Sequence, residues 1–77
     1  MIDWKERISS NPKVIVGKPA IKGTRIGVDL ILEKLGAGES IDQIIESYPH
    51  INRDDIYACL LYAAETIRHE SVHPIHS

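Results

Sequence analysis

The chain has 77 residues, of which 43% are hydrophobic and 26% charged, with a formal net charge of -2. The length is that of one small domain, and the charged fraction near the globular average argues against a disordered chain. No stretch reaches the roughly 18–20 apolar residues of a membrane span, the N-terminus lacks a signal-peptide pattern, and a single cysteine cannot form an internal disulfide. We expect one cytoplasmic domain over residues 1–70, followed by a flexible tail over 71–77.

The charges are unevenly distributed. Residues 9–28 contain four cations and no acid, whereas residues 29–77 contain nine acids and three cations. A basic segment can follow a phosphate backbone, so we expect DNA contacts from Lys13, Lys18, Lys22 and Arg25. The alternative is that these four are ordinary solvated charges, because a committed DNA binder makes about six to ten phosphate contacts.

The first predicted element is a short β arm or hairpin over residues 12–26. A turn signal, Asn11-Pro12, precedes the β-branched run Val14-Ile15-Val16. Pro19 restricts the following segment to a sheet edge or a turn.

Helical periodicity begins after Ile26 and predicts three helices, over residues 28–36, 41–48 and 53–69. Apolar residues recur at helical spacing in the first two, Gly36 and Gly38 end the first, and Ser40 with Gln43 forms a capping box for the second. Asn52 caps the third. The expected fold is therefore mainly α: a β arm followed by a three-helix, helix-turn-helix-like domain of homeodomain-like or winged-helix-like type.

The third helix is uncharged from Ile56 to Ala64, so it is expected to be buried on more than one side. Its predicted core stripe is Ile56, Leu60, Ala63 or Ala64, and Ile67. A second face, formed by Tyr57, Leu61 and Tyr62, is predicted to be a protein interface. The alternative is that the N-terminal arm covers this face. Because a domain of this size without a disulfide is marginally stable alone, we expect a homodimer.

The helices over 41–48 and 53–69 have the proportions of a helix-turn-helix, whose second helix reads the major groove. Arg53 is placed to contact a base or a phosphate, whereas Asp54 and Asp55 repel phosphates. A purely structural helical hairpin is the alternative.

We expect no enzyme, no cofactor and no metal site. His69-Glu70-Ser71-Val72-His73 has the spacing of a zinc-protease motif. However, Pro74 displaces His73 from helical geometry, and only three residues follow Pro74 to supply a third zinc ligand. No nucleophile with a nearby base stands out elsewhere.

The string Gly17-Lys18-Pro19-Ala20-Ile21-Lys22-Gly23-Thr24-Arg25-Ile26, with the spacing of apolar residues that follows it, closely resembles domain-of-unknown-function family 433 (DUF433) over about residues 5–66. The resemblance implies a helix-turn-helix-like fold and an antitoxin that binds a PIN-like nuclease toxin encoded beside it and represses its own operon. Gly27 departs from the family, whose members often carry proline there. Gly23 is expected to supply an unusual backbone angle and Thr24 a local cap, while Arg25 either fixes the arm by an ion pair or contacts DNA.

The predicted function is therefore that of an antitoxin. The alternative is a protein-interaction or dimerisation module without DNA binding.

Overall fold

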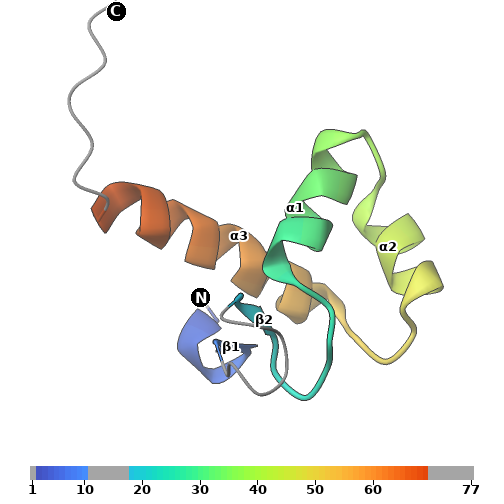
Figure 1. Cartoon of the computed structure of the whole chain (residues 1–77). Coiled ribbons are helices and arrows are strands. Elements are labelled where there is room, and N and C mark those ends of the chain that lie inside the picture. The colour runs from blue at the N-terminus through green and yellow to red at the C-terminus, as the bar shows by residue number, and fades with distance from the viewer. Residues whose placement is uncertain (1, 11–17, 70–77) are drawn as a thin grey trace, which may run out of the picture.

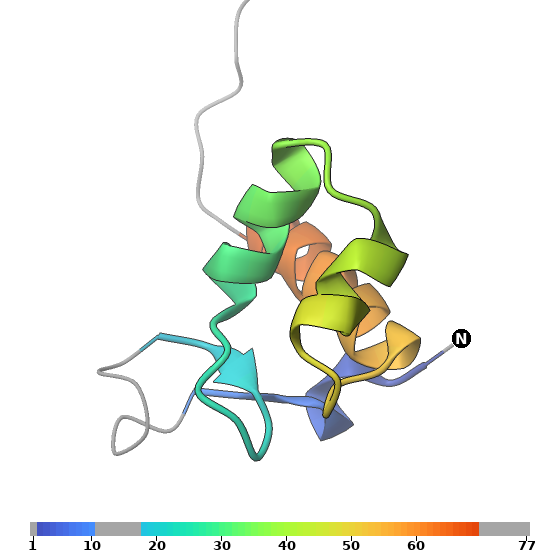
Figure 2. The ribbon, with the colours of Figure 1, turned by 90° about the vertical axis from the view of Figure 1, so that its right-hand side faces the viewer.

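The computed structural model describes residues 2–10 and 18–69 of the chain. A 3-10 helix, η1 (Trp4–Glu6), precedes two short strands, β1 (Ile8–Ser9) and β2 (Ala20–Ile21), and three helices follow, α1 (Val28–Gly36), α2 (Ile41–Ser47) and α3 (Arg53–His69). α1 and α2 pack over the N-terminal half of α3, whereas its C-terminal half extends beyond them (Figure 1, Figure 2). The mainly helical fold with a short hairpin is confirmed, and the predicted helix ends agree with these bounds to within one residue.

The hairpin differs from the arm predicted over residues 12–26. β1 lies before that range and pairs antiparallel with β2, with Ile8 opposite Ile21 and Ser9 opposite Ala20. The prediction relied on a β-branched run and the turn signals beside it, and a strand of two residues such as Ile8–Ser9 is too short to give a comparable signal. The run Val14-Ile15-Val16 lies outside the described residues, as does the predicted tail over 71–77.

A tight turn leads from β2 toward α1 and depends on Gly23 and Thr24. Gly23 has a φ of 80°, which a side chain would strain. The Thr24 hydroxyl donates to the Ile21 carbonyl at 2.7 Å and accepts from the Ile26 amide at 3.0 Å. Both expectations for this motif are confirmed.

Side-chain caps define where α2 and α3 begin. The Ser40 hydroxyl accepts from the Gln43 amide at 3.1 Å, and the Gln43 side chain accepts from the Ser40 amide at 2.7 Å, which confirms the predicted capping box. A second reciprocal pair precedes α3: Asn52 Oδ1 accepts from the Asp55 amide and Asp55 Oδ2 accepts from the Asn52 amide, both at 3.0 Å. The Asp55 carboxylate thus satisfies the Asn52 amide at the start of α3.

The core is aliphatic. Its largest fully buried side chains are Ile31 of α1, Ile44 of α2, and Ile56 and Cys59 of α3. The other buried hydrophobic residues come from the hairpin (Ile8, Ala20 and Ile21), the loops (Ile26 and Ile51), the start of α1 (Val28) and α3 (Ala58).

The predicted core stripe of α3 was wrong at two positions. Leu60 is 42% exposed and Ile67 is 69% exposed. The buried face instead carries the small side chains Ala58 and Cys59 beside Ile56. Because the run from 56 to 64 is apolar on every side, its sequence gives no periodic signal of which side faces inward. Ile67 also lies in the last turn of α3, two residues before its C-terminal end.

Candidate protein interface along the third helix

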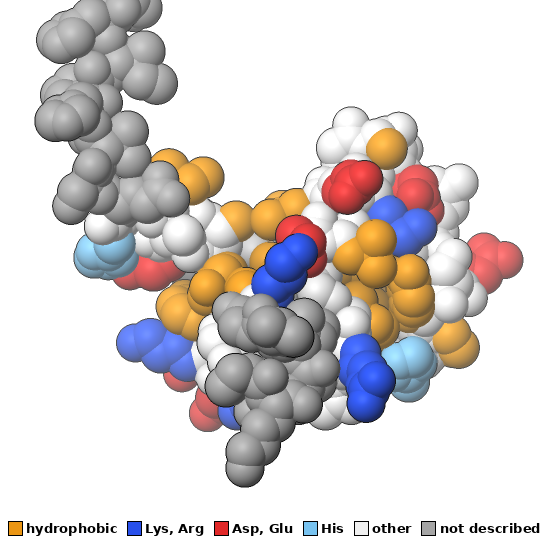
Figure 3. Space-filling view, viewed as in Figure 1, with side chains coloured by type: hydrophobic (Ala, Val, Ile, Leu, Met, Phe, Trp, Pro, Cys, Tyr) orange, Lys and Arg blue, Asp and Glu red, His pale blue; other side chains and the backbone are white. Residues whose placement is uncertain are grey.

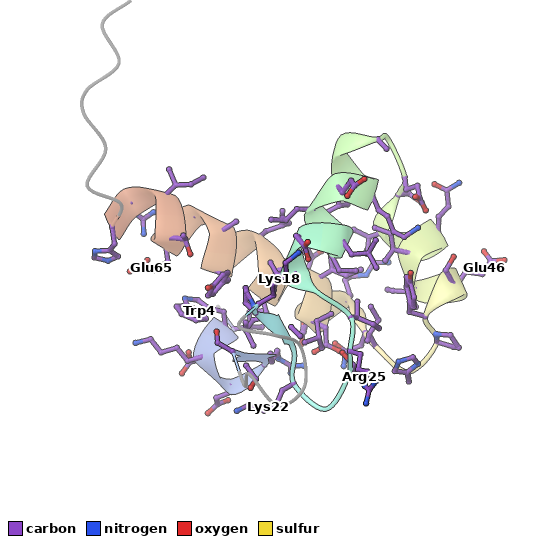
Figure 4. All side chains as sticks on the ribbon, in the orientation of Figure 1. Trp4, Lys18, Lys22, Arg25, Glu46 and Glu65 are labelled. Carbon is purple, nitrogen blue, oxygen red and sulfur yellow. The ribbon has the colours of Figure 1, made fainter. Side chains whose placement is uncertain are left out.

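The N-terminal segment, which comprises η1 and β1, packs against one side of α3. The ring of Trp4, which is labelled in Figure 4, packs edge-on against the ring of Tyr62, with centroids 5.2 Å apart and planes at 79°. An Arg7 nitrogen lies 3.1 Å from Asp55 Oδ1 and another lies 3.7 Å from Asp54 Oδ2. The ring of Tyr62, which was predicted to lie in a protein interface, therefore packs partly against Trp4 of its own chain.

Two apolar hollows remain on either side of α3. The first, which we call the α1–α3 groove, has a volume of about 310 Å³. Its walls include Pro19, Leu32, Tyr62, Ala63, Thr66 and Ile67. Figure 3 shows hydrophobic side chains along α3 and toward α1 on this face of the molecule.

The second hollow, which we call the Ile2 hollow, has a volume of about 380 Å³ and is lined by Ile2, Tyr57, Leu60 and Leu61. The three residues predicted as an interface are thus divided: Tyr57 and Leu61 line the Ile2 hollow, and Tyr62 lines the α1–α3 groove. Sequence reasoning missed Leu60 and Ile67, which were assigned to the core. Exposed apolar surface of this kind is typical of binding sites.

The residues predicted to bind DNA do not form one cluster. Lys18, Lys22 and Arg25 are exposed along the segment that leads into α1 (Figure 4), and Lys18 Nζ lies 3.7 Å from Asp29 Oδ2. Arg25 forms no ion pair with a described residue. Lys13 lies outside the described residues.

Arg53, at the start of α3, is paired with Asp42 of α2. Hydrogen bonding to Tyr57 and the negative charge of Asp42 raise the pKa of the Arg53 guanidinium. A phosphate would therefore compete with a carboxylate that Arg53 already contacts.

The surface beside Lys22 is electrostatically mixed. A polar hollow of about 420 Å³ there is lined by Glu6, Arg7, Lys22, Gly23 and Asp55. The two carboxylates offset the two cations, so this hollow does not provide the excess positive charge that an anion site needs. The sequence did not indicate the ion pairs of Arg7, because its partners Asp54 and Asp55 are 47 and 48 positions away along the chain.

Cys59 is fully buried, and burial raises the pKa of its thiol to about 12, with a smaller contribution from the charge of Asp55. It is therefore not placed as a nucleophile. Within residues 2–10 and 18–69 no group of three or more His, Cys, Asp or Glu residues is arranged to hold a metal ion. None of the described helices has the length and apolar character needed to cross a bilayer.

Comparison with known proteins identifies relatives of this chain. Residues 8–63 match the model of the family described as "Protein of unknown function (DUF433)". The chain is 29% identical over 59 residues to "Uncharacterized protein y4eO" of Sinorhizobium fredii, a match that covers 77% of the chain and 27% of that protein. The chain also resembles the crystal structure of a DUF433 member protein from Anabaena variabilis, with a TM-score of 0.75 and 24% identity. That match covers 80% of this chain and 61% of the other. The chain thus spans about a quarter of the curated relative and about three fifths of the solved one.

Proposed function

The chain belongs to the DUF433 family, and on that premise we propose that it is an antitoxin-type protein that binds and neutralises a PIN-like nuclease in the cytoplasm. The observation that supports a protein partner is the α1–α3 groove, whose apolar walls face solvent. Ile67, in one wall, is 69% exposed, the largest exposure among the large hydrophobic side chains of the described residues. The nuclease as the partner follows from the resemblance to DUF433 proteins encoded beside such toxins.

The groove is suited to an apolar segment of the partner. It lies between two helices, and an amphipathic helix commonly docks its apolar face in a groove of this type. Thr66 and Asp29 at its edges supply polar groups for orientation. Binding there would cover Ile67 and Leu32 without disturbing the buried core.

The first test is the open reading frame adjacent to the gene, which is expected to encode a PIN-like nuclease. The second is inhibition of RNA cleavage by that nuclease on titration with the purified chain. Ile67→Glu should weaken inhibition at least about tenfold, since it places a charge in the apolar groove. Ala37→Glu, which adds the same charge at an exposed position between α1 and α2, should leave inhibition unchanged. A nuclease that is unaffected by the unaltered chain would overturn the proposal.

Operator binding is a second candidate function, supported by the exposure of Lys18, Lys22 and Arg25 on an acid-free stretch of the chain. Three phosphate contacts per chain predict that affinity for the promoter falls roughly fiftyfold between about 50 and 200 mM salt. Arg25→Ala should reduce this dependence, whereas Arg53→Ala should change it less because Asp42 already pairs with Arg53. Absent or salt-independent binding would leave a protein-interaction module without DNA binding.

A further inference from the structure

The solvent side of α3 carries a line of apolar side chains that we call the α3 stripe, formed by Tyr57, Leu60, Leu61 and Ala64. Their spacing of three, one and three residues places them on one face of the helix. Tyr57 is 40% exposed and Leu60 is 42% exposed, while Leu61 is half-buried. The stripe borders the Ile2 hollow and is distinct from the walls of the α1–α3 groove.

Opposite charges lie at equal distances from the centre of this stripe. Asp54 precedes Leu61 by seven residues and Arg68 follows it by seven, so both lie close to the same face of α3. The Asp54 side chain is 49% exposed and the Arg68 side chain is 68% exposed. A two-fold axis through Leu61 would therefore bring Asp54 of one chain to Arg68 of another, twice.

We propose that the α3 stripe binds the same stripe of a second copy of this chain, with the two α3 helices antiparallel and Leu61 beside the two-fold axis. The apolar centre of the contact is Leu60 and Leu61, which fill the Ile2 hollow of the opposite copy. A parallel arrangement is disfavoured because it would place Asp54 against Asp54 and Arg68 against Arg68.

The charges at both ends remain available for this contact. Asp54 is 3.7 Å from Arg7, a long ion pair, and the closer partner of Arg7 is Asp55. Arg68 uses one guanidinium nitrogen on Glu65 at 2.8 Å, which leaves other donors free for a second carboxylate. The dimer does not require the nuclease, so it is tested on the purified chain alone.

Sedimentation equilibrium of the purified chain is expected to show a dimer. Leu60→Glu should weaken the dimer at least about thirtyfold, since two charges would enter the apolar centre. Thr66→Glu is the matched control: it adds the same charge to an exposed position of α3, but in the wall of the α1–α3 groove, and should leave the dimer intact. A thermal melt of each variant checks that it is folded. A monomeric unaltered chain, or a dimer that persists with Leu60→Glu, would overturn the proposal and leave the stripe to a different partner.

Charge reversal tests the antiparallel arrangement. Asp54→Lys and Arg68→Glu should each weaken the dimer about threefold to tenfold, as expected for two exposed ion pairs turned repulsive. The double variant restores opposite charges at both ends of an antiparallel pair and should recover the original affinity to within about twofold. A double variant as weak as the weaker single one would show that these residues do not meet across the axis.

Discussion

Gly23 and Gly27 stand four residues apart in the segment between β2 and α1, and the backbone requires glycine at only one of them. Gly23 has a φ of 80°, whereas Gly27, the N-cap of α1, has a φ of -69° and a ψ of 145°. The second pair of angles lies within the range that proline fixes. A Cβ at position 27 would crowd the Asp29 carboxylate, an exposed side chain whose ion pair with Lys18 is 3.7 Å long. That side chain is free to rotate away at small cost.

At the residue scale we therefore predict opposite effects of two substitutions. Gly27→Pro should raise the free energy of unfolding by about 0.4–1 kcal/mol, because it restricts the unfolded chain at a position whose folded conformation proline accepts. Gly23→Ala should lower it by about 1–2 kcal/mol, because a side chain is strained at positive φ. Urea unfolding followed by circular dichroism measures both. A destabilised Gly27→Pro variant would show that the Asp29 carboxylate cannot move.

At the scale of elements, short sequence motifs correctly predicted the helix caps and the turn before α1. The Ser40–Gln43 capping box and the Asn52 cap each involve residues only three positions apart, so the start of each helix could be predicted from a short segment. The turn at Gly23 and Thr24 is equally local. The contact between the N-terminal segment and α3 could not be predicted from local sequence patterns. Arg7 and Asp55 are 48 positions apart, and the residues around one carry no information about the position of the other. Leu60 and Ile67 were wrongly assigned to the core because the side of α3 that faces inward is set by packing against distant segments of the chain, which the apolar run itself does not indicate.

Asp55 joins two elements, because the same carboxylate caps α3 and holds Arg7 of the N-terminal segment. The Asp55 side chain is 14% exposed and the Arg7 side chain 34%, so the ion pair is partly sheltered from solvent, whereas the cap is exposed. Asp55→Ala removes the cap and the ion pair and should lower the free energy of unfolding by about 2 kcal/mol. Asp55→Asn retains an oxygen that can accept from the Asn52 amide but loses the charge. It should therefore lower the free energy of unfolding by only about 1 kcal/mol. Equal losses for the two variants in thermal unfolding would mean that only the charge matters.

At the scale of the whole molecule, Cys59 reports on the integrity of the core. It is fully buried beside Ile31, Ile44 and Ile56, which come from all three α-helices. Displacement of any one helix would expose it. In a domain this small the core is expected to open as one unit, so the thiol should react with a thiol reagent only in proportion to global unfolding.

The same burial predicts how stability changes with alkaline pH. Burial raises the pKa of the Cys59 thiol from 9.0 to about 12 in the folded chain, so between these values the unfolded chain releases a proton that the folded chain retains. The contribution of this group is therefore fully present below pH 9 and is lost as the pH rises toward 12, by up to about 1.4 kcal/mol per pH unit. Tyrosines and lysines titrate in the same range, so the measurement is the difference in pH slope between the unaltered chain and Cys59→Ala in urea unfolding. Cys59→Ala should start less stable, because it leaves a small cavity, but lose less stability from pH 9 to pH 11. Parallel slopes for the two proteins would show that the thiol ionises in the folded core as readily as in the unfolded chain.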